Sequence, residues 1–143
     1  MATERVPGTL SVATGVWVAA GSRDEPERVA GVSHFLEHLL FKGTTSRSAQ
    51  DIARGVDRLG GDFNAFTAKE YTAYYCRLPA RHAGHAFDLL GDVLCRPALR
   101  DDDVHSERQV ILEELAMDDE APDDVAHRAF AATLFSDHPL GRD

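Results

Sequence analysis

The sequence predicts an α+β fold in which helices pack on a largely antiparallel or mixed β-sheet. Residues 62–67 and 71–78 are strand-like and are separated by a short polar segment, which is typical of a β-hairpin. Other segments carry apolar residues at helical spacing, but strands and helices do not alternate strictly as in a parallel α/β fold. With 143 residues, the chain is long enough for one domain with its own core.

The first predicted element is a strand over residues 10–20. This segment is rich in valine, has small residues at alternate positions and lacks a polar face, so we expect it to be buried on both sides. A charged loop with a proline follows at 21–27. Residues 31–43 then have the pattern of an apolar helix, which we expect to be buried, with Gly43 as its C-terminal cap.

The rest of the chain is predicted to be mainly helical outside the hairpin. A helix is expected over 48–59, and another over 81–96 that ends before Pro97. The expected buried stripe of the latter consists of Ala83, Ala86, Phe87, Leu90 and Leu94. A helix is predicted over 103–118, with residues 101–103 offering N-caps and negative charge for its first turn, and a weaker helical pattern covers 123–135.

Composition excludes several classes of function. The chain has 24 Asp and Glu against 15 Lys and Arg, a formal net charge of −9, which disfavours a surface for nucleic acid or anionic membranes. Its two cysteines are too few for a disulfide framework. Its apolar runs are shorter than the ~20 residues of a membrane span, and the first residues lack the order of a signal peptide. We therefore expect a cytoplasmic protein.

His34, Glu37 and His38 are the residues most indicative of chemistry. In a helix, side chains four positions apart lie on one side, so both imidazoles can reach one ion. At ~100° per residue Glu37 falls on the same arc, opposite the apolar positions. Two buried histidines bonded to backbone would be the alternative. The His-x-x-Glu-His order, however, is the inverted zincin motif, with two metal ligands and a Glu as general base.

Residues 34–44 resemble the active-site helix of the inverted-zincin metallopeptidases, the family of pitrilysin, insulysin and the mitochondrial processing peptidase. Four other segments resemble family segments in the same order: 15–25, 64–72, 107–114 and 138–141. The likeness covers nearly the whole chain and is greatest to the processing-peptidase-like branch. It implies that residues 1–143 are a single N-terminal catalytic domain, truncated after Asp143 and lacking a strand before Leu10.

A third metal ligand is expected from the helix over 103–118. Val104, Glu107, Ile111 and Glu114 share one stripe of this helix, which places two carboxylates on an otherwise apolar face. Solvated acids at an exposed helix end would be the alternative. The resemblance to the family assigns Glu114 as the third zinc ligand and Glu107 as an acid that orients a ligand histidine. Glu113 is turned about 100° away and is expected at the surface.

Other polar residues carry weaker signals. Asn64 and Ala65 resemble the family's edge strand, on which an extended peptide substrate adds by backbone hydrogen bonds. A purely structural strand would have the same sequence pattern. His82 and His85 are expected at the surface, and Cys76 and Cys95 are expected to be packed thiols.

The sequence therefore predicts a zinc metalloendopeptidase that cleaves peptides or unfolded protein segments. As the resemblance implies, His34, His38 and Glu114 would hold Zn²⁺, and Glu37 would take a proton from the zinc-bound water. A homologous C-terminal half or partner subunit is expected to close over the site. The alternatives are a non-catalytic assembly subunit of the same fold, as in the respiratory cytochrome bc complex, and a hydrolase that acts on other bonds.

Overall fold

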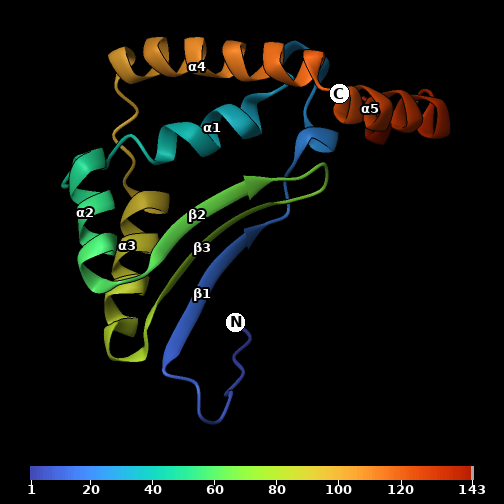
Figure 1. Ribbon diagram of the computed structural model, residues 1–143. Helices are drawn as coiled ribbons and strands as arrows, with labels where there is room; N and C mark the ends of the chain where they lie inside the picture. The colour runs from blue at the N-terminus through green and yellow to red at the C-terminus, as the bar shows by residue number, and fades with distance from the viewer. Residues whose placement is uncertain (143) are drawn as a thin grey trace.

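A three-stranded antiparallel sheet lies under the helices of this protein (Figure 1). The computed structural model describes residues 1–142. The strands are β1 (Ser11–Val18), β2 (Asp62–Thr67) and β3 (Thr72–Pro79), in the order β1-β3-β2. The hairpin of β2 and β3 and the antiparallel α+β class are both as predicted. Because β3 is central, β2 lies at one edge of the sheet.

Five α-helices accompany this sheet in residues 1–142. They are α1 (Val32–Leu40), α2 (Ala49–Leu59), α3 (Ala83–Cys95), α4 (Asp101–Glu120) and α5 (Pro122–Phe135). Helices α2 and α3 pack on the sheet, α1 lies between the sheet and α4, and α5 extends away from the body beyond the end of α4 (Figure 1). The buried core is formed where α2 and α3 meet β2 and β3, around Ile52, Tyr74, Cys76 and Leu90. None of the helices in this part of the chain is long and apolar enough to cross a membrane.

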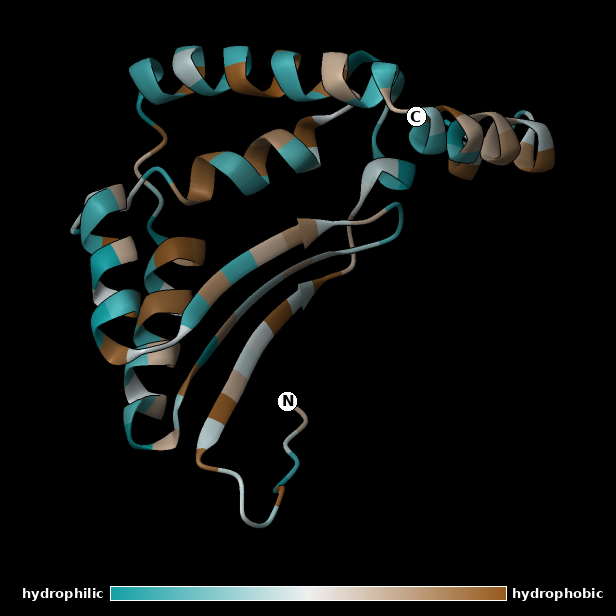
Figure 2. Cartoon of the chain, viewed as in Figure 1, coloured by the Kyte–Doolittle hydropathy of each residue, from teal (hydrophilic) through white to brown (hydrophobic). Residues whose placement is uncertain are grey.

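The prediction that the first strand is buried on both sides is wrong. β1 begins at Ser11, Leu10 is exposed, and the Trp17 side chain keeps 64% of its surface exposed. β1 is an edge strand, and its apolar residues Val16, Trp17 and Val18 are exposed in the described chain. Figure 2 shows apolar positions along this strand. An apolar pattern shows that a strand can be buried on both faces, but it cannot show what covers each face.

Two helices differ from their predicted form. α1 ends at Leu40, with Phe41 as its C-cap, so Gly43 lies beyond the helix and pairs with Ser48 in an isolated bridge. The first half of α1 is also only partly buried, because α4 covers just one side of it. In α3, Phe87 is 61% exposed and the buried residues are Ala86, Leu90, Asp92 and Val93. The buried stripe of α3 is therefore rotated relative to the predicted stripe. Cys95, which was expected to be a packed thiol, is exposed.

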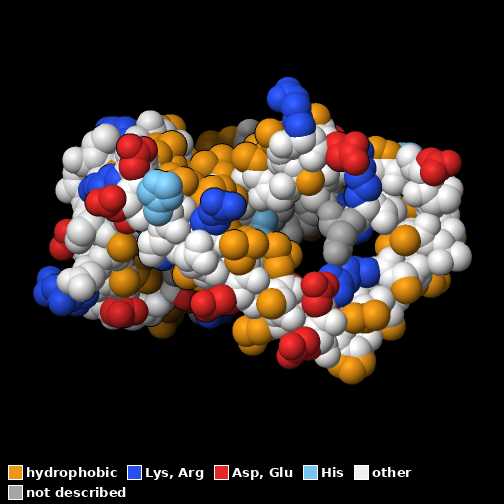
Figure 3. Space-filling view, turned by 90° about the horizontal axis from the view of Figure 1, so that it is seen from above, with side chains coloured by type: hydrophobic (Ala, Val, Ile, Leu, Met, Phe, Trp, Pro, Cys, Tyr) orange, Lys and Arg blue, Asp and Glu red, His pale blue; other side chains and the backbone are white. Residues whose placement is uncertain are grey.

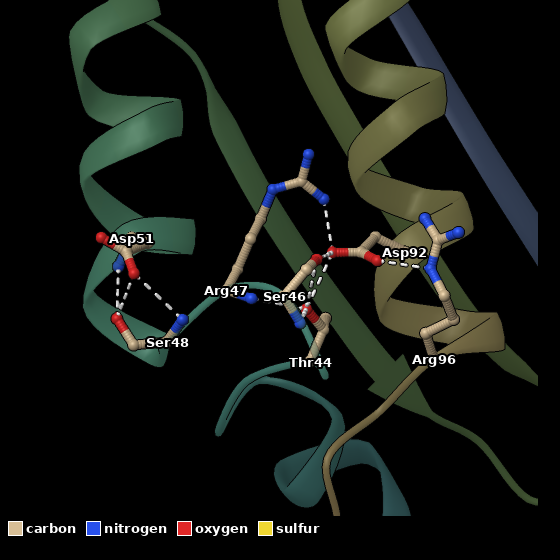
Figure 4. A network of polar contacts seen from close by, with 7 residues as sticks. All are labelled: Thr44, Ser46, Arg47, Ser48, Asp51, Asp92 and Arg96. Carbon is tan, nitrogen blue, oxygen red and sulfur yellow. Dashed lines mark hydrogen bonds and ion pairs between the residues drawn. The ribbon is translucent and has the colours of Figure 1, made fainter.

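A buried acid holds the loop between α1 and α2 against α3 (Figure 4). The Asp92 carboxylate is fully buried and accepts hydrogen bonds from Thr44 Oγ1 at 2.8 Å and Ser46 Oγ at 3.0 Å. It also forms ion pairs with Arg47 and with Arg96, the latter at 2.7 Å. Burial alone would raise the pKa of Asp92, but these four donors lower it well below its ordinary value. This loop follows the His-x-x-Glu-His helix directly, so the network fixes where α1 ends.

Candidate metal centre

The two histidines of α1 face one another across one turn of helix. The Nε2 atoms of His34 and His38 are 3.1 Å apart, and their rings meet edge to face. Gly31 precedes the helix with φ of +87°, a left-handed conformation that glycine adopts without strain. The chain can therefore turn sharply into α1 from the preceding loop, and the helix begins at Val32, two residues before His34.

Glu25 caps the start of α1, a contact that the sequence did not predict. Its buried carboxylate accepts hydrogen bonds from the backbone N–H groups of Gly31 at 2.6 Å and Ser33 at 2.7 Å. These groups have no partner within the helix, and a negative charge there is favoured by the helix dipole. Burial opposes ionisation, but the hydrogen bonds from Ser33 and Gly31 lower the pKa of Glu25 below its ordinary value. Glu25 lies in the loop six residues from Gly31, where no periodic pattern marks a capping residue.

Helix α4 brings Glu114 to the pair of histidines. Glu114 Oε2 lies 3.5 Å from His38 Nε2 and 3.9 Å from His34 Nε2. Among residues 1–142, this is the one group of three His, Cys, Asp or Glu side chains whose donor atoms lie close enough together to hold a metal ion. Glu113, the adjacent acid, is exposed as predicted, and the predicted stripe of Glu107, Ile111 and Glu114 is the side of α4 that turns toward α1.

Glu107 fixes the tautomer of His38. The Glu107 carboxylate lies in α4, is only 3% exposed, and approaches His38 Nδ1 to 2.9 Å. Its other oxygen forms an ion pair with the Lys42 ammonium. Burial favours the neutral acid, but the contacts with Lys42 and His38 lower the pKa of Glu107. The carboxylate is therefore ionised and accepts a hydrogen bond from the Nδ1–H group of His38. The lone pair of His38 is thereby left on Nε2, the atom that faces His34 and Glu114.

This donor set fits zinc. Two imidazole nitrogens and one carboxylate oxygen are common zinc ligands, and a histidine whose other nitrogen is bound to a carboxylate is the usual arrangement. Ligands of a tetrahedral zinc, with bonds of ~2.0–2.1 Å, lie roughly 3.3–3.4 Å apart. The observed separations of 3.1, 3.5 and 3.9 Å surround this value. All three groups are partly exposed, so a substrate can approach them.

Glu37 belongs to α1 but is held by the sheet. Its Oε2 atom accepts a hydrogen bond of 2.6 Å from Thr67 Oγ1 at the end of β2. Burial, and after it the negative charge of Glu37, raise the pKa of Tyr74 in the neighbouring strand β3 to about 12. Glu37 thus stands beside the metal cluster of His34, His38 and Glu114 without being one of its donors.

Asn64 and Ala65 lie in β2, the edge strand of the sheet on the side of α1. Asn64 is exposed and its side-chain oxygen accepts the Ala65 N–H at 2.9 Å, whereas Ala65 is buried in the core. Any contact of Ala65 with a substrate would therefore be through its backbone. His82 and His85 lie near one another at the start of α3, away from these residues, and are not joined there by a third metal donor within residues 1–142.

The residues in this cluster and their order are those of a known family. The whole chain, residues 1–143, matches the family model described as Insulinase (Peptidase family M16). The chain belongs to peptidase family M16. An uncharacterized zinc protease of Mycobacterium tuberculosis is 52% identical over 140 residues, covering 98% of this chain and 32% of that protein. The uncharacterized zinc protease YmxG of Bacillus subtilis is 44% identical over 138 residues, covering 96% of this chain and 34% of that protein.

Solved structures share the fold of this M16 chain. A protease from Helicobacter pylori superposes with a TM-score of 0.88 at 30% identity, over 94% of this chain and 33% of that chain. An M16 inactive domain from Pseudomonas fluorescens has a TM-score of 0.85 at 20% identity, over 96% and 34% of the two chains. The second likeness shows the fold alone. The present chain spans about a third of the length of the relatives that it matches.

Proposed function

We propose that this M16 chain carries the active site of a zinc-dependent metalloendopeptidase. The observation that carries the proposal is the convergence of His34 Nε2, His38 Nε2 and a Glu114 oxygen, with Glu37 beside them on the same helix. The fold by itself is insufficient support, because a structural neighbour with the same fold is named an inactive domain. The names of the relatives, which are called zinc proteases, agree with the residues of this site.

In this proposal His34, His38 and Glu114 hold the zinc ion. Glu107 keeps the His38 proton on Nδ1, so that Nε2 is free to bind. Bound zinc supplies two things: it makes a water molecule acidic enough to attack at neutral pH, and it polarises the scissile carbonyl. His34, His38 and Glu114 would supply the three protein ligands that catalytic zinc sites usually have.

Glu37 acts as the general base. Its carboxylate accepts the proton of the attacking water and later donates it to the leaving amine nitrogen. The hydrogen bond from Thr67 Oγ1 holds this carboxylate in place between α1 and the end of β2. A carboxylate that also bound the metal would accept a proton less readily, because its lone pairs would be engaged by the ion.

The substrate is proposed to be a peptide or an unfolded protein segment in extended conformation. β2 is an edge strand that ends at Thr67, the residue bonded to the proposed base. A peptide that pairs with the backbone of this edge, along Asn64 and Ala65, would bring its carbonyl groups past Glu37. The portion of the relatives beyond this chain's match is proposed to contribute the opposite wall of the substrate site.

Zinc content and peptide turnover together test the proposal. Protein loaded with zinc is expected to contain one ion per chain and, at the length of its relatives, to cleave an unstructured peptide. Removal of zinc by a chelator should abolish cleavage, and added zinc should restore it. One bound zinc with no peptide turnover would support the assembly subunit instead. Hydrolysis of other bonds without peptide cleavage would support a hydrolase of another class.

A further inference from the structure

The buried carboxylate of Glu107 lies between two side chains that belong to one segment. His38 Nδ1 donates to Oε1 at 2.9 Å, and the Lys42 ammonium forms an ion pair with Oε2. Oε2 is shielded from solvent and has no hydrogen bond to any other group in residues 1–142. The two carboxylate oxygens therefore have one partner each, and both partners are presented by α1 and the turn that follows it.

The position of Lys42 follows from the end of the helix. Lys42 comes four residues after His38 and just past the C-cap residue Phe41, and its backbone N–H still bonds to Leu39 O at 3.1 Å. The lysine thus continues the helical direction, so its side chain lies one turn beyond His38 on the side that faces α4. Glu107 projects from α4 between the two. The positive charge of Lys42 compensates the buried carboxylate of Glu107.

We propose that Lys42 is a positioning residue of the metal centre. It holds Oε2 of Glu107, so that Oε1 is directed to His38 and the His38 lone pair stays on Nε2. Lys42 does not reach the metal ligands directly; it acts through Glu107. The inference rests on the proposed function where it concerns zinc. It adds Lys42 as the residue that positions Glu107, which in turn orients His38.

An ion pair with only a structural role would have a different consequence. In that case loss of the Lys42 charge would lower the melting temperature, and zinc affinity would be unaffected in the folded protein. A positioning role instead predicts weaker zinc binding by folded protein, and predicts that this effect requires the Glu107 carboxylate. Charge-preserving and charge-removing substitutions at Lys42 separate the two possibilities.

The experiment compares Lys42→Met, Lys42→Arg, Glu107→Gln and the double variant Lys42→Met with Glu107→Gln in the full-length protein. Arg54→Met is the matched control, since it removes one positive charge from an exposed position of α2. Zinc affinity is measured by competition with a chelator at fixed pH. The His38 tautomer is measured in zinc-free protein by ¹⁵N NMR, and circular dichroism shows that each variant is folded.

We expect Lys42→Met to weaken zinc binding about 10-fold, the lower end of the range for loss of an outer partner, and to reduce the fraction of His38 protonated on Nδ1. Lys42→Arg and Arg54→Met should remain near the wild type. On the Glu107→Gln background, Lys42→Met should have little further effect. Unchanged zinc affinity and tautomer in folded Lys42→Met, or an equal loss on both backgrounds, would overturn the inference. If the wild type binds no zinc, the proposed function fails, and the His38 tautomer alone decides the role of Lys42.

Discussion

Three acids near the paired histidines have different surroundings, and these surroundings distinguish their roles. Glu37 bonds to Thr67 of the sheet, Glu107 is buried against His38, and Glu114 is half-exposed beside both Nε2 atoms. A carboxylate among imidazole nitrogens is suited to bind a metal, and one held beside the site by a hydroxyl is suited to move a proton. Substitutions at single residues can therefore separate the roles.

Glu37→Gln is expected to retain zinc and to lose peptide hydrolysis. The amide has nearly the shape of the acid and can still bond to Thr67, but it cannot accept the proton of the attacking water. The expected loss of rate is ~10²–10⁴-fold. Zinc analysis and turnover are measured on the same preparation. Loss of zinc together with activity would mean that Glu37 is a ligand.

Glu114→Gln should weaken zinc binding severely, whereas Glu113→Gln should leave it unchanged. Glu114 lies 3.5 Å from His38 Nε2, while its neighbour is turned toward solvent. The two variants carry the same change of charge, so each controls for the other. Chelator competition measures both affinities, and similar losses in the two would contradict the ligand assignment.

At the scale of elements, the helical pattern of the sequence predicted which residues share a face of a helix. It did not predict which elements are covered by the rest of the chain. The phase of α4 followed from Glu107, Ile111 and Glu114, because residues three and four apart share a face whatever packs on them. The exposure of Trp17 in β1 and of Phe87 in α3 depends on which parts of the chain cover these elements. That information is distributed over the whole sequence and is absent from local periodicity.

The sequence also did not reveal the acids that hold the ends of α1. Glu25 caps the start of the helix, and Asp92 binds the loop after its end. Both contacts join residues from different elements, and an isolated acid in a loop or on a helix has the same appearance whether it is solvated or buried. Lys42 was missed for the same reason, since its partner Glu107 is contributed by α4.

Asp92→Asn is expected to destabilise the fold by roughly 3 kcal/mol, the lower end of the cost of breaking a buried ion pair, since both arginines can be rehydrated. The variant should also alter the pH dependence of stability. The pKa of Asp92 is lowered in the folded state, so its contribution is complete above the pKa of the unfolded chain, ~3.9, and is lost as pH falls toward the folded value. Denaturant unfolding at pH 7 and at low pH measures both effects. A difference between wild type and variant that stayed constant on acidification would contradict this assignment.

At the scale of the whole molecule, several large apolar side chains lie at the described surface. Trp17 of β1, Leu112 of α4, and Phe130 and Leu134 of α5 are all exposed, and hydrophobic side chains are visible between the charged ones in Figure 3. Large apolar side chains at a surface are favoured where other protein covers them. The chain spans about a third of its relatives, so these areas are proposed to contact the remainder of the full-length protein.

Residues 1–143 alone are expected to show little or no peptidase activity, although all three metal donors are present. His34, His38 and Glu114 are all partly exposed in residues 1–142, so a peptide bound there is neither shielded from water nor held in position for attack. Turnover of an unstructured peptide by zinc-loaded 1–143 is compared with turnover by a chain of the relatives' length. Robust cleavage by residues 1–143 that disappears with chelator and in Glu37→Gln would show that this part is sufficient.

Anomalous diffraction at the zinc absorption edge, from crystals of the zinc-loaded protein, tests the account most directly. It locates the ion independently of activity. The expected result is one zinc site about 2.0–2.2 Å from His34 Nε2, His38 Nε2 and a Glu114 oxygen, with Glu37 outside the coordination sphere. Zinc at His82 and His85, zinc bound by Glu37 in place of Glu114, or no ordered zinc at the histidines of α1 would contradict the account.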